Sequence, residues 1–245
     1  MIIVSASLPK SGSTWLFHMT EAILVAAGHP SYRDMLDRPL LRGLIKERSG
    51  DFGYANPVKL ARMFPHATRG RHLLVRTHYQ PSRTLRTLIR LGHARATYVY
   101  RDPRDVVLSA IDHGERARSR GSDHELSVLR TVDDGIRYAR EELFPHHRRW
   151  MAAPGTLRLR YEDVTADPVA AMTTIAQHIG LDVPQATVED VVRQFDKSAM
   201  SADEKARLLI NKASPQRFRR EMTEDEVART TEAFRAELDE MGYAA

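Results

Sequence analysis

The sequence of 245 residues contains no cysteine and no apolar run long enough to cross a membrane. Without cysteine there is no disulfide and no thiolate metal site, so a reducing compartment, the cytoplasm, is the expected location. A transmembrane helix needs about 18 consecutive apolar residues, and we therefore expect no membrane span. Residues 1–7 lack a basic leader and predict a strand rather than a secretory signal.

Aromatic residues are scarce, at 7%, and the sequence has no zinc-finger, helix-turn-helix or aromatic RNA-binding pattern. Because the arginines are scattered, the net charge of +5 does not indicate nucleic acid, although a focused positive patch would concentrate a small polyanion. There is no His-Glu-x-x-His motif and no carboxylate cluster, and the adjacent His146 and His147 are expected on a helix surface. We therefore expect no metal.

Short β-rich runs alternate with helical patterns along the chain. The expected strands are Ile2–Ser7, His72–Thr77, Thr97–Tyr100 and Thr156–Tyr161. A helix with apolar residues at helical spacing is expected from about Thr14 to Ala27. Strands separated by helices predict an α/β fold with a P-loop-type parallel sheet flanked by helices. No repeat, linker or second boundary interrupts residues 1–245, so a single domain is expected.

Capping residues, proline and glycine mark several helix boundaries. They predict helices over residues 103–113, 168–179 and 224–241, with N-caps at Asp102, Asp167 and Thr223 and stops at Gly114, Gly180 and Gly242. Thr223 and Glu226 are expected to form a capping box, and Pro145 to break a helix that begins near Thr131. Residues 29–70 and 114–127 have no clear pattern. The second of these is expected to be a mobile surface loop, and each would be either an acceptor-contacting region or surface filler.

The segment from Pro9 to Trp15 follows a strand and opens a helix. At such a junction free backbone N–H groups and the helix dipole converge on an anion. Gly12 allows close backbone approach, Lys10 adds a point charge, and hydroxyl donors come from Ser11, Ser13 and Thr14. Lys10 precedes Gly12, whereas a Walker A loop places lysine after its second glycine. The alternative is an ordinary strand–helix turn with a capping Ser or Thr.

The segment Pro9–Trp15 resembles the 5′-phosphosulfate loop of the sulfotransferases that use 3′-phosphoadenylyl sulfate (PAPS). Residues 98–109 resemble the 3′-phosphate site of that family, in which an arginine at a strand end, here Arg101, is followed eight residues later by a helix serine, here Ser109. An arginine can offer phosphate two parallel donors. The alternatives are an ion pair of Arg101 with Asp102 or Asp105, and a packed helix serine.

Residues 74–78 resemble the Lys-Thr-His segment that carries the catalytic base in the cytosolic branch of the family. The resemblance implies that His78 is the base, and Arg76 stands where lysine is usual. Arg76 is expected to stabilise the transferring sulfuryl oxygens. Two alternatives remain: a histidine with a purely structural role, and the carboxylate base that some relatives use.

The resemblance also assigns an adenine site and a C-terminal loop. Tyr161, in a strand-end Tyr-Glu-Asp, would reach the adenine, Trp15 would stack on it and Phe195 would cover its other face. Residues 211–223 align with the family's Arg-Lys-Gly segment, in which Lys212 is kept and Ala213 replaces glycine. Asn211 replaces an arginine that clamps the 3′-phosphate. The substitutes available nearby are Arg217, Arg219 and Arg220.

The resemblance therefore implies a PAPS-dependent sulfotransferase that releases 3′,5′-adenosine bisphosphate (PAP) and needs no metal. Its partner would be a small-molecule hydroxyl acceptor, with no nucleic acid; carbohydrate, phenol, lipid and peptide-derived alcohols stay open, as does oligomer formation. One alternative is a P-loop small-molecule kinase, which would need a lysine after the second glycine and an acidic Mg²⁺ ligand at a strand end. The other is a non-catalytic nucleotide or polyanion binder.

Overall fold

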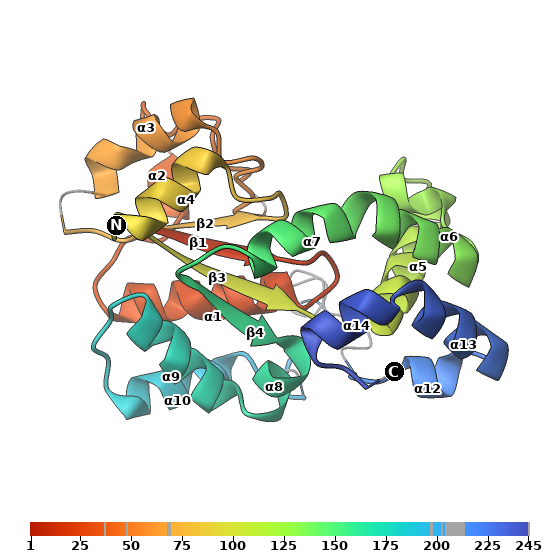
Figure 1. The fold of residues 1–245 in the computed structure, drawn as a ribbon. Coiled ribbons are helices and arrows are strands. Elements are labelled where there is room, and N and C mark those ends of the chain that lie inside the picture. The colour runs from red at the N-terminus through yellow and green to blue at the C-terminus, as the bar shows by residue number, and fades with distance from the viewer. Residues whose placement is uncertain are drawn as a thin grey trace.

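The computed structural model describes residues 1–36, 38–47, 49–67, 70–196, 198–201, 203 and 214–244 (Figure 1). Its elements are β1 (Ile2–Ser7), α1 (Ser13–Ala26), α2 (Arg33–Leu36), α3 (Pro57–Ala67), β2 (Leu73–Thr77), α4 (Arg83–Arg90), β3 (Ala94–Tyr100), α5 (Pro103–Ser119), η1 (Glu125–Val128), α6 (Val132–Tyr138), η2 (Ala139–Leu143), α7 (Phe144–Met151), β4 (Thr156–Arg160), α8 (Tyr161–Ala166), α9 (Pro168–His178), α10 (Gln185–Gln194), α12 (Phe218–Glu221), α13 (Glu224–Ala233) and α14 (Arg235–Met241).

The four strands form one parallel sheet in the order β2-β1-β3-β4. All six residues of β1 are buried, because this strand is central and helices cover both of its faces. Helices α1, α9 and α10 pack on one face, and α3 and α4 on the other (Figure 1). The predicted α/β class, with a parallel sheet flanked by helices, is confirmed.

A second group of helices, α5–α7 and α12–α14, lies beyond the carboxyl ends of the strands (Figure 1). The ring of Trp150 on α7 stacks on Tyr98 of β3 with centroids 5.7 Å apart. The Tyr98 hydroxyl and His147 Nδ1 are 3.0 Å apart, and His147 is fully buried. The prediction of a surface position for His147 is therefore wrong, because this histidine fixes α7 to the sheet.

Most helix boundaries follow the predicted signals. Thr223 and Glu226 form a capping box at the start of α13, and α9 begins at Pro168 and is followed by Gly180 with φ 77°. Near Pro145 the helical hydrogen bonding shifts to a π turn, η2, and α7 then restarts at Phe144. This shift removes the need for a hydrogen bond from the proline nitrogen.

Two helix predictions are wrong. Helix α5 continues through Gly114 to Ser119, so residues 114–119 are helical rather than part of a loop. A Cβ on Gly114 would lie 2.1 Å from the carbonyl oxygen of Leu126, and the glycine therefore serves close packing against η1. The last helix is divided at Phe234, which is fully buried and packs on Phe144 with ring centroids 5.1 Å apart.

No helix in the described ranges is both long enough and apolar enough to cross a membrane.

Candidate functional site

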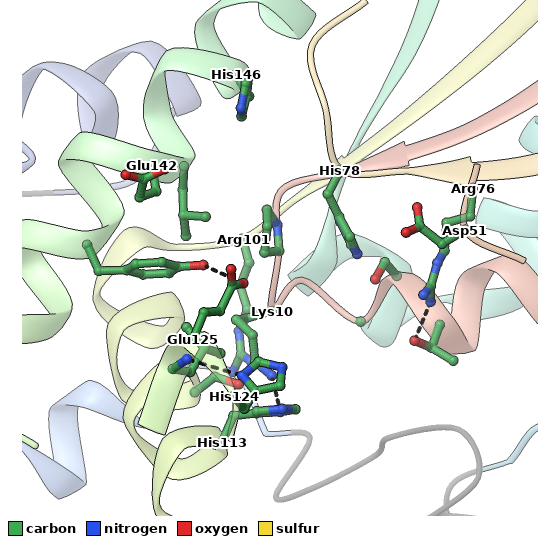
Figure 2. Close-up of a pocket in the computed structure, with 18 of the residues that line it drawn as sticks. Lys10, Asp51, Arg76, His78, Arg101, His113, His124, Glu125, Glu142 and His146 are labelled. Atoms are coloured by element: carbon green, nitrogen blue, oxygen red, sulfur yellow. Dashed lines mark hydrogen bonds between the residues drawn. The ribbon is translucent and has the colours of Figure 1, made fainter. Parts of the chain in front are cut away.

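A cavity of about 940 Å³ lies at the carboxyl ends of the strands, between the sheet and helices α5–α7 (Figure 2). Open parallel sheets bind their ligands at this edge. The structure brings most of the predicted site residues to this cavity, namely Pro9, Lys10, Gly12, Ser13, Thr14, Trp15, Arg76, His78, Arg101, Ser109 and Tyr161. Segments that are far apart in the sequence therefore share one space.

The loop after β1 has the backbone geometry of an anion cradle. Lys10 and Gly12 both adopt left-handed conformations, with φ of 71° and 73°. A Cβ on Gly12 would come within 2.6 Å of Cε2 of Tyr161, so the loop needs glycine for its conformation and for its packing. Gly12 is the N-cap of α1 and no side chain of the described residues caps this helix, so the turn is not one with a capping Ser or Thr among them. The first N–H groups of α1 are left for a ligand.

Ser11 departs from the prediction. Its side chain is fully buried, does not line the cavity, and its hydroxyl has no hydrogen-bond partner among the residues whose placement is described. The strand–loop path turns this side chain inward, so its hydroxyl is not among the donors that the cavity offers. Ser13 and Thr14 line the cavity as expected.

Lys10 extends across the cavity toward α5, where its Nζ lies 3.0 Å from Nδ1 of His113 (Figure 2). Burial, together with the nearby charge of Arg116, lowers the pKa of Lys10 from 10.5 to about 8. Burial and the charge of Lys10 likewise lower the pKa of His113 to about 4. His113 is therefore neutral at pH 7, and its Nδ1 accepts a hydrogen bond from the lysine ammonium; an anion bound here would restore the pKa of Lys10.

His78 follows β2 and meets the end of β1. Its Nδ1 lies 2.9 Å from Oγ and 3.3 Å from the carbonyl oxygen of Ser7. Since the carbonyl only accepts, Nδ1 is the protonated nitrogen and Nε2 carries the lone pair. Nε2 makes no hydrogen bond to any described residue, and the ring lines the cavity. Burial and the charge of Arg76 lower the pKa of His78 to about 4, so this imidazole is neutral at pH 7.

Arg76 is buried and donates from NH1 to Oγ1 of Thr14 at 2.6 Å (Figure 2). Its Nε is buried without a hydrogen-bond partner in the part of the chain that is described. Because Thr14 accepts from the guanidinium, the hydroxyl hydrogen of Thr14 remains available to a ligand. Arg76 therefore orients a donor on the loop.

Arg101 makes an ion pair with Asp105, one of the two alternatives that the sequence allows. Its NH2 lies 2.8 Å from Oδ2 of Asp105 and 2.6 Å from the carbonyl oxygen of Ser214, and its guanidinium lies 4.6 Å from the centroid of the Tyr161 ring. Nε is buried with no partner in the described ranges, and the side chain still lines the cavity beside Ser109. One edge of the guanidinium is fixed, and donors remain for an anion.

A second pocket, of about 420 Å³, adjoins the first at Trp15, which lines both. Trp15 Nε1 donates to the carbonyl oxygen of Phe195 at 2.8 Å. Phe195 lines the second pocket but not the first. Phe195 is thus separated from the main cavity but is in contact with Trp15. Trp15 and Phe195 line this second pocket together.

The residues predicted for the C-terminal loop are only partly described by the structure. Asn211, Lys212 and Ala213 lie outside the described residues. Of the three substitutes considered for the missing arginine, only Arg217 lines the cavity, and Asp112 and Glu221 each bind its NH2 at 2.7 Å. Arg219 and Arg220 are exposed and do not line it.

The sequence reasoning missed cavity residues on α5. His113 and Arg116 lie four and seven residues after Ser109, so they share its helix face. The side chain of Arg116 makes no hydrogen bond or ion pair with any residue that the structure describes. Helical spacing from Ser109 could have identified His113 within the predicted helix, and Arg116 once α5 was known to continue past Gly114.

The profile of the family described as "Sulfotransferase domain" matches residues 2–242, nearly the whole chain. The chain belongs to this family. Cytosolic sulfotransferase 3 of Arabidopsis thaliana is 23% identical over 184 residues, which are 73% of this chain and 52% of that protein. The match thus spans about half the length of this curated relative.

Two solved structures share the fold of this sulfotransferase family member at low identity. Mouse sulfotransferase SULT7A1 complexed with PAP has a TM-score of 0.63 and 16% identity, over 99% of this chain and 89% of the mouse chain. Retinol dehydratase in complex with androsterone and PAP has a TM-score of 0.60 and 16% identity, over 97% of this chain and 80% of that chain. These similarities establish the fold.

Proposed function

We propose that this protein transfers the sulfuryl group of PAPS to a hydroxyl group of a small molecule and releases PAP. The observation that carries the proposal is that the Lys10 loop and Arg101 line one cavity, so a single doubly phosphorylated nucleotide can contact both. Membership of the sulfotransferase family and the PAP named in the related structures support this choice of donor. The cytosolic relative supports a cytoplasmic location.

The cavity residues fit such a nucleotide. The uncapped N-terminus of α1 and the close approach at Gly12 suit the 5′-phosphosulfate. Arg101, with its orphaned Nε, and Ser109 suit the 3′-phosphate, joined by Lys212 and Ala213 as the family resemblance implies. The adenine would lie against Trp15, between Tyr161 on the side of the cavity and Phe195 on the side of the second pocket.

Arg116 is the best replacement for the arginine lost at position 211. It lines the cavity and makes no ion pair with a described residue, whereas Arg217 is already matched by two carboxylates. Burial lowers the pKa of Arg116, and the nearby charge of Asp112 only partly offsets this effect.

PAPS, when bound, supplies an activated sulfuryl group, which forms a bond to the acceptor oxygen as the bond to the 5′-phosphate oxygen breaks. His78 Nε2 takes the proton of the acceptor hydroxyl, while Ser7 holds Nδ1 and fixes the tautomer. A pKa of about 4 keeps this base unprotonated at pH 7. A positioned general base is worth about 10²–10⁴ in rate.

Lys10 and the loop N–H groups stabilise the negative charge that develops on the departing phosphate. Donors of this kind, fixed before the reaction, contribute roughly 3–4 kcal/mol each. Thr14, oriented by Arg76, adds a hydroxyl donor on the same loop, and Arg76 itself supplies positive charge to the sulfuryl oxygens. The site provides this charge from fixed side chains and N–H dipoles, so no metal is proposed.

The test compares PAP with ATP·Mg²⁺ by thermal shift and calorimetry. PAP at 100 times its Kd should stabilise the protein by roughly 2.7 kcal/mol, and ATP·Mg²⁺ should not. Stabilisation by ATP·Mg²⁺ alone would favour a kinase, and PAP binding without sulfuryl transfer to any hydroxyl would favour a non-catalytic binder.

Lys10→Met provides the matched test of the loop. Removing a charge-assisted hydrogen bond worth about 1.5–3 kcal/mol should weaken PAP binding roughly 10- to 150-fold. Lys46→Met is the control, because Lys46 lines the same cavity but is exposed and lies 3.6 Å from its own partner, Asp51. Equal losses in the two variants would refute a specific role for Lys10.

A further inference from the structure

One side of the cavity is formed by residues that are not among the proposed contacts of PAPS, and we assign this side to the acceptor. This acceptor wall comprises residues 123–126 at η1 and residues 138–146 of α6, η2 and α7 that face the cavity. Figure 2 shows Glu125, Glu142 and His146 on it, across the cavity from His78. A hydroxyl that reaches His78 Nε2 would therefore belong to a molecule that lies against this wall.

The acceptor wall is poor in apolar surface. Its only apolar side chains in the described ranges are Leu126 and Leu143, both buried, and the others are carboxylates, imidazoles and a phenol. An apolar acceptor would cover these polar groups without giving them partners, which is unfavourable. A hydroxyl-rich acceptor would instead satisfy them.

The acceptor wall also carries negative charge that the protein leaves unmatched. Asp123 and Glu142 make no hydrogen bond or ion pair within the described residues, and Glu125 has only the Tyr138 hydroxyl at 3.5 Å. No lysine or arginine of residues 123–146 lines the cavity. On α5, Arg116 lines the cavity, and its charge acts on Lys10 at the donor side.

Two of these carboxylates face the same phenol. Burial first, then the charges of Glu125 and Glu142, raise the pKa of Tyr138. Both carboxylates therefore lie on the same side of the cavity as Tyr138, and both line it. His146 on the same wall has a lowered pKa because of burial, and its buried Nδ1 has no hydrogen-bond partner among the described residues. A neutral imidazole does not balance the carboxylates, but it accepts a hydrogen bond from a hydroxyl.

We propose, on the basis of the sulfotransferase function above, that the acceptor is a polyol with a protonated amine, of the amino-sugar or amino-cyclitol class. Glu125 and Glu142 hold the ammonium group, Tyr138 and His146 bind neighbouring hydroxyls, and the hydroxyl to be sulfated faces His78. The two carboxylates carry the charge opposite to that of the ammonium group, so they select such a molecule over neutral and apolar alcohols.

The experiment measures transfer of radioactive sulfate from PAPS to kanamycin A, to its N-acetylated derivative and to 2-naphthol. Kanamycin A should have a kcat/KM at least ten times that of either comparison acceptor. The variant Glu125→Gln/Glu142→Gln should lose at least tenfold in kcat/KM for kanamycin A, and the N-acetylated acceptor and PAP binding should change less than twofold. Glu141→Gln is the control, because Glu141 neighbours Glu142 and is likewise exposed, but does not line the cavity.

Equal or faster transfer to 2-naphthol or to the N-acetylated acceptor would overturn the inference while leaving the proposed function intact. If PAP binds and none of the three is sulfated, calorimetry on the PAP-bound protein decides: binding of kanamycin A that the double variant abolishes supports the inference, and its absence refutes it. Failure of PAP itself to bind would refute the proposed function, and the inference with it.

Discussion

Replacing Gly12 by alanine tests the tightest contact in the nucleotide loop. Gly12 has φ 73°, and a Cβ placed there would lie 2.6 Å from Cε2 and 2.9 Å from Cδ2 of Tyr161. The ring cannot move freely, because Tyr161 is buried and the guanidinium of Arg101 lies over it. Gly12→Ala therefore combines backbone strain with a steric clash.

Backbone strain and the steric clash each contribute to the loss of stability expected for Gly12→Ala. A non-glycine residue in the left-handed region costs about 1–2 kcal/mol, and forcing extra volume into a packed site costs typically 1–3 kcal/mol. The sum, roughly 2–5 kcal/mol, is a large part of the 5–15 kcal/mol that is typical of a folded domain. Gly28→Ala is the matched control, because Gly28 has φ 81° and a Cβ there would meet nothing within 4 Å.

Urea unfolding of the two variants measures the difference, and PAP calorimetry measures its effect on the site. Gly12→Ala should be about 1–3 kcal/mol less stable than Gly28→Ala. It should also bind PAP at least tenfold more weakly, because a displaced Tyr161 disturbs Arg101. Adding Tyr161→Ala should relieve the clash, so that the two substitutions are not additive. If Gly12→Ala and Gly28→Ala were equally stable, the Gly12–Tyr161 contact would not be as tight as described.

Three further predictions concern the base, the lysine and α5. His78→Gln should lower kcat by about 10²–10⁴ and leave the Kd of PAP within a factor of two; normal turnover would point to a carboxylate base. Since Lys10 has a pKa of about 8, its ammonium is lost as the pH rises past this value, and PAP binding measured by calorimetry should weaken by up to about tenfold between pH 7 and 9. Lys10→Met should remove this pH step, and its persistence would assign the step to another group. Gly114→Ala, which in an open helix would gain about 1 kcal/mol, should instead destabilise the protein in urea unfolding, because its Cβ would meet the Leu126 carbonyl at 2.1 Å.

The sheet and much of the cavity could be predicted from the sequence because their signals are local. A buried parallel strand is a short apolar run, and the loop after β1 has its glycine, lysine and hydroxyl residues within seven positions. Parallel strands also end at one edge, which brings His78 and Arg101 to the same side as the loop. These features depend on order along the chain rather than on detailed packing.

The errors arise where tertiary contacts decide. Gly114 has the form of a helix stop, but Leu126 approaches so closely that only glycine fits. His147 is polar, yet the hydroxyl of Tyr98 gives it a partner inside the core. Whether Ser11 faces the cavity or the interior depends on the left-handed turn at Lys10, which no residue pattern announces. Sequence order cannot supply the contacts of Gly114 and His147, because each joins segments with independent local signals.

The buried pair of Arg101 and Asp105 shows why an ion pair and a phosphate site need not be alternatives. Asp105 is fully buried, and its second oxygen accepts from the backbone N–H of Phe218 at 3.0 Å. The same carboxylate therefore orients Arg101 and positions the start of α12, while Arg217 ties that segment to Asp112. For Arg217 to bind a phosphate it would have to share or leave carboxylates that already match its charge, which is costly for a buried group. Arg101 keeps an open Nε, and Arg116 makes no hydrogen bond or ion pair with a described residue, so an incoming 3′-phosphate can reach these two arginines without breaking an existing pair.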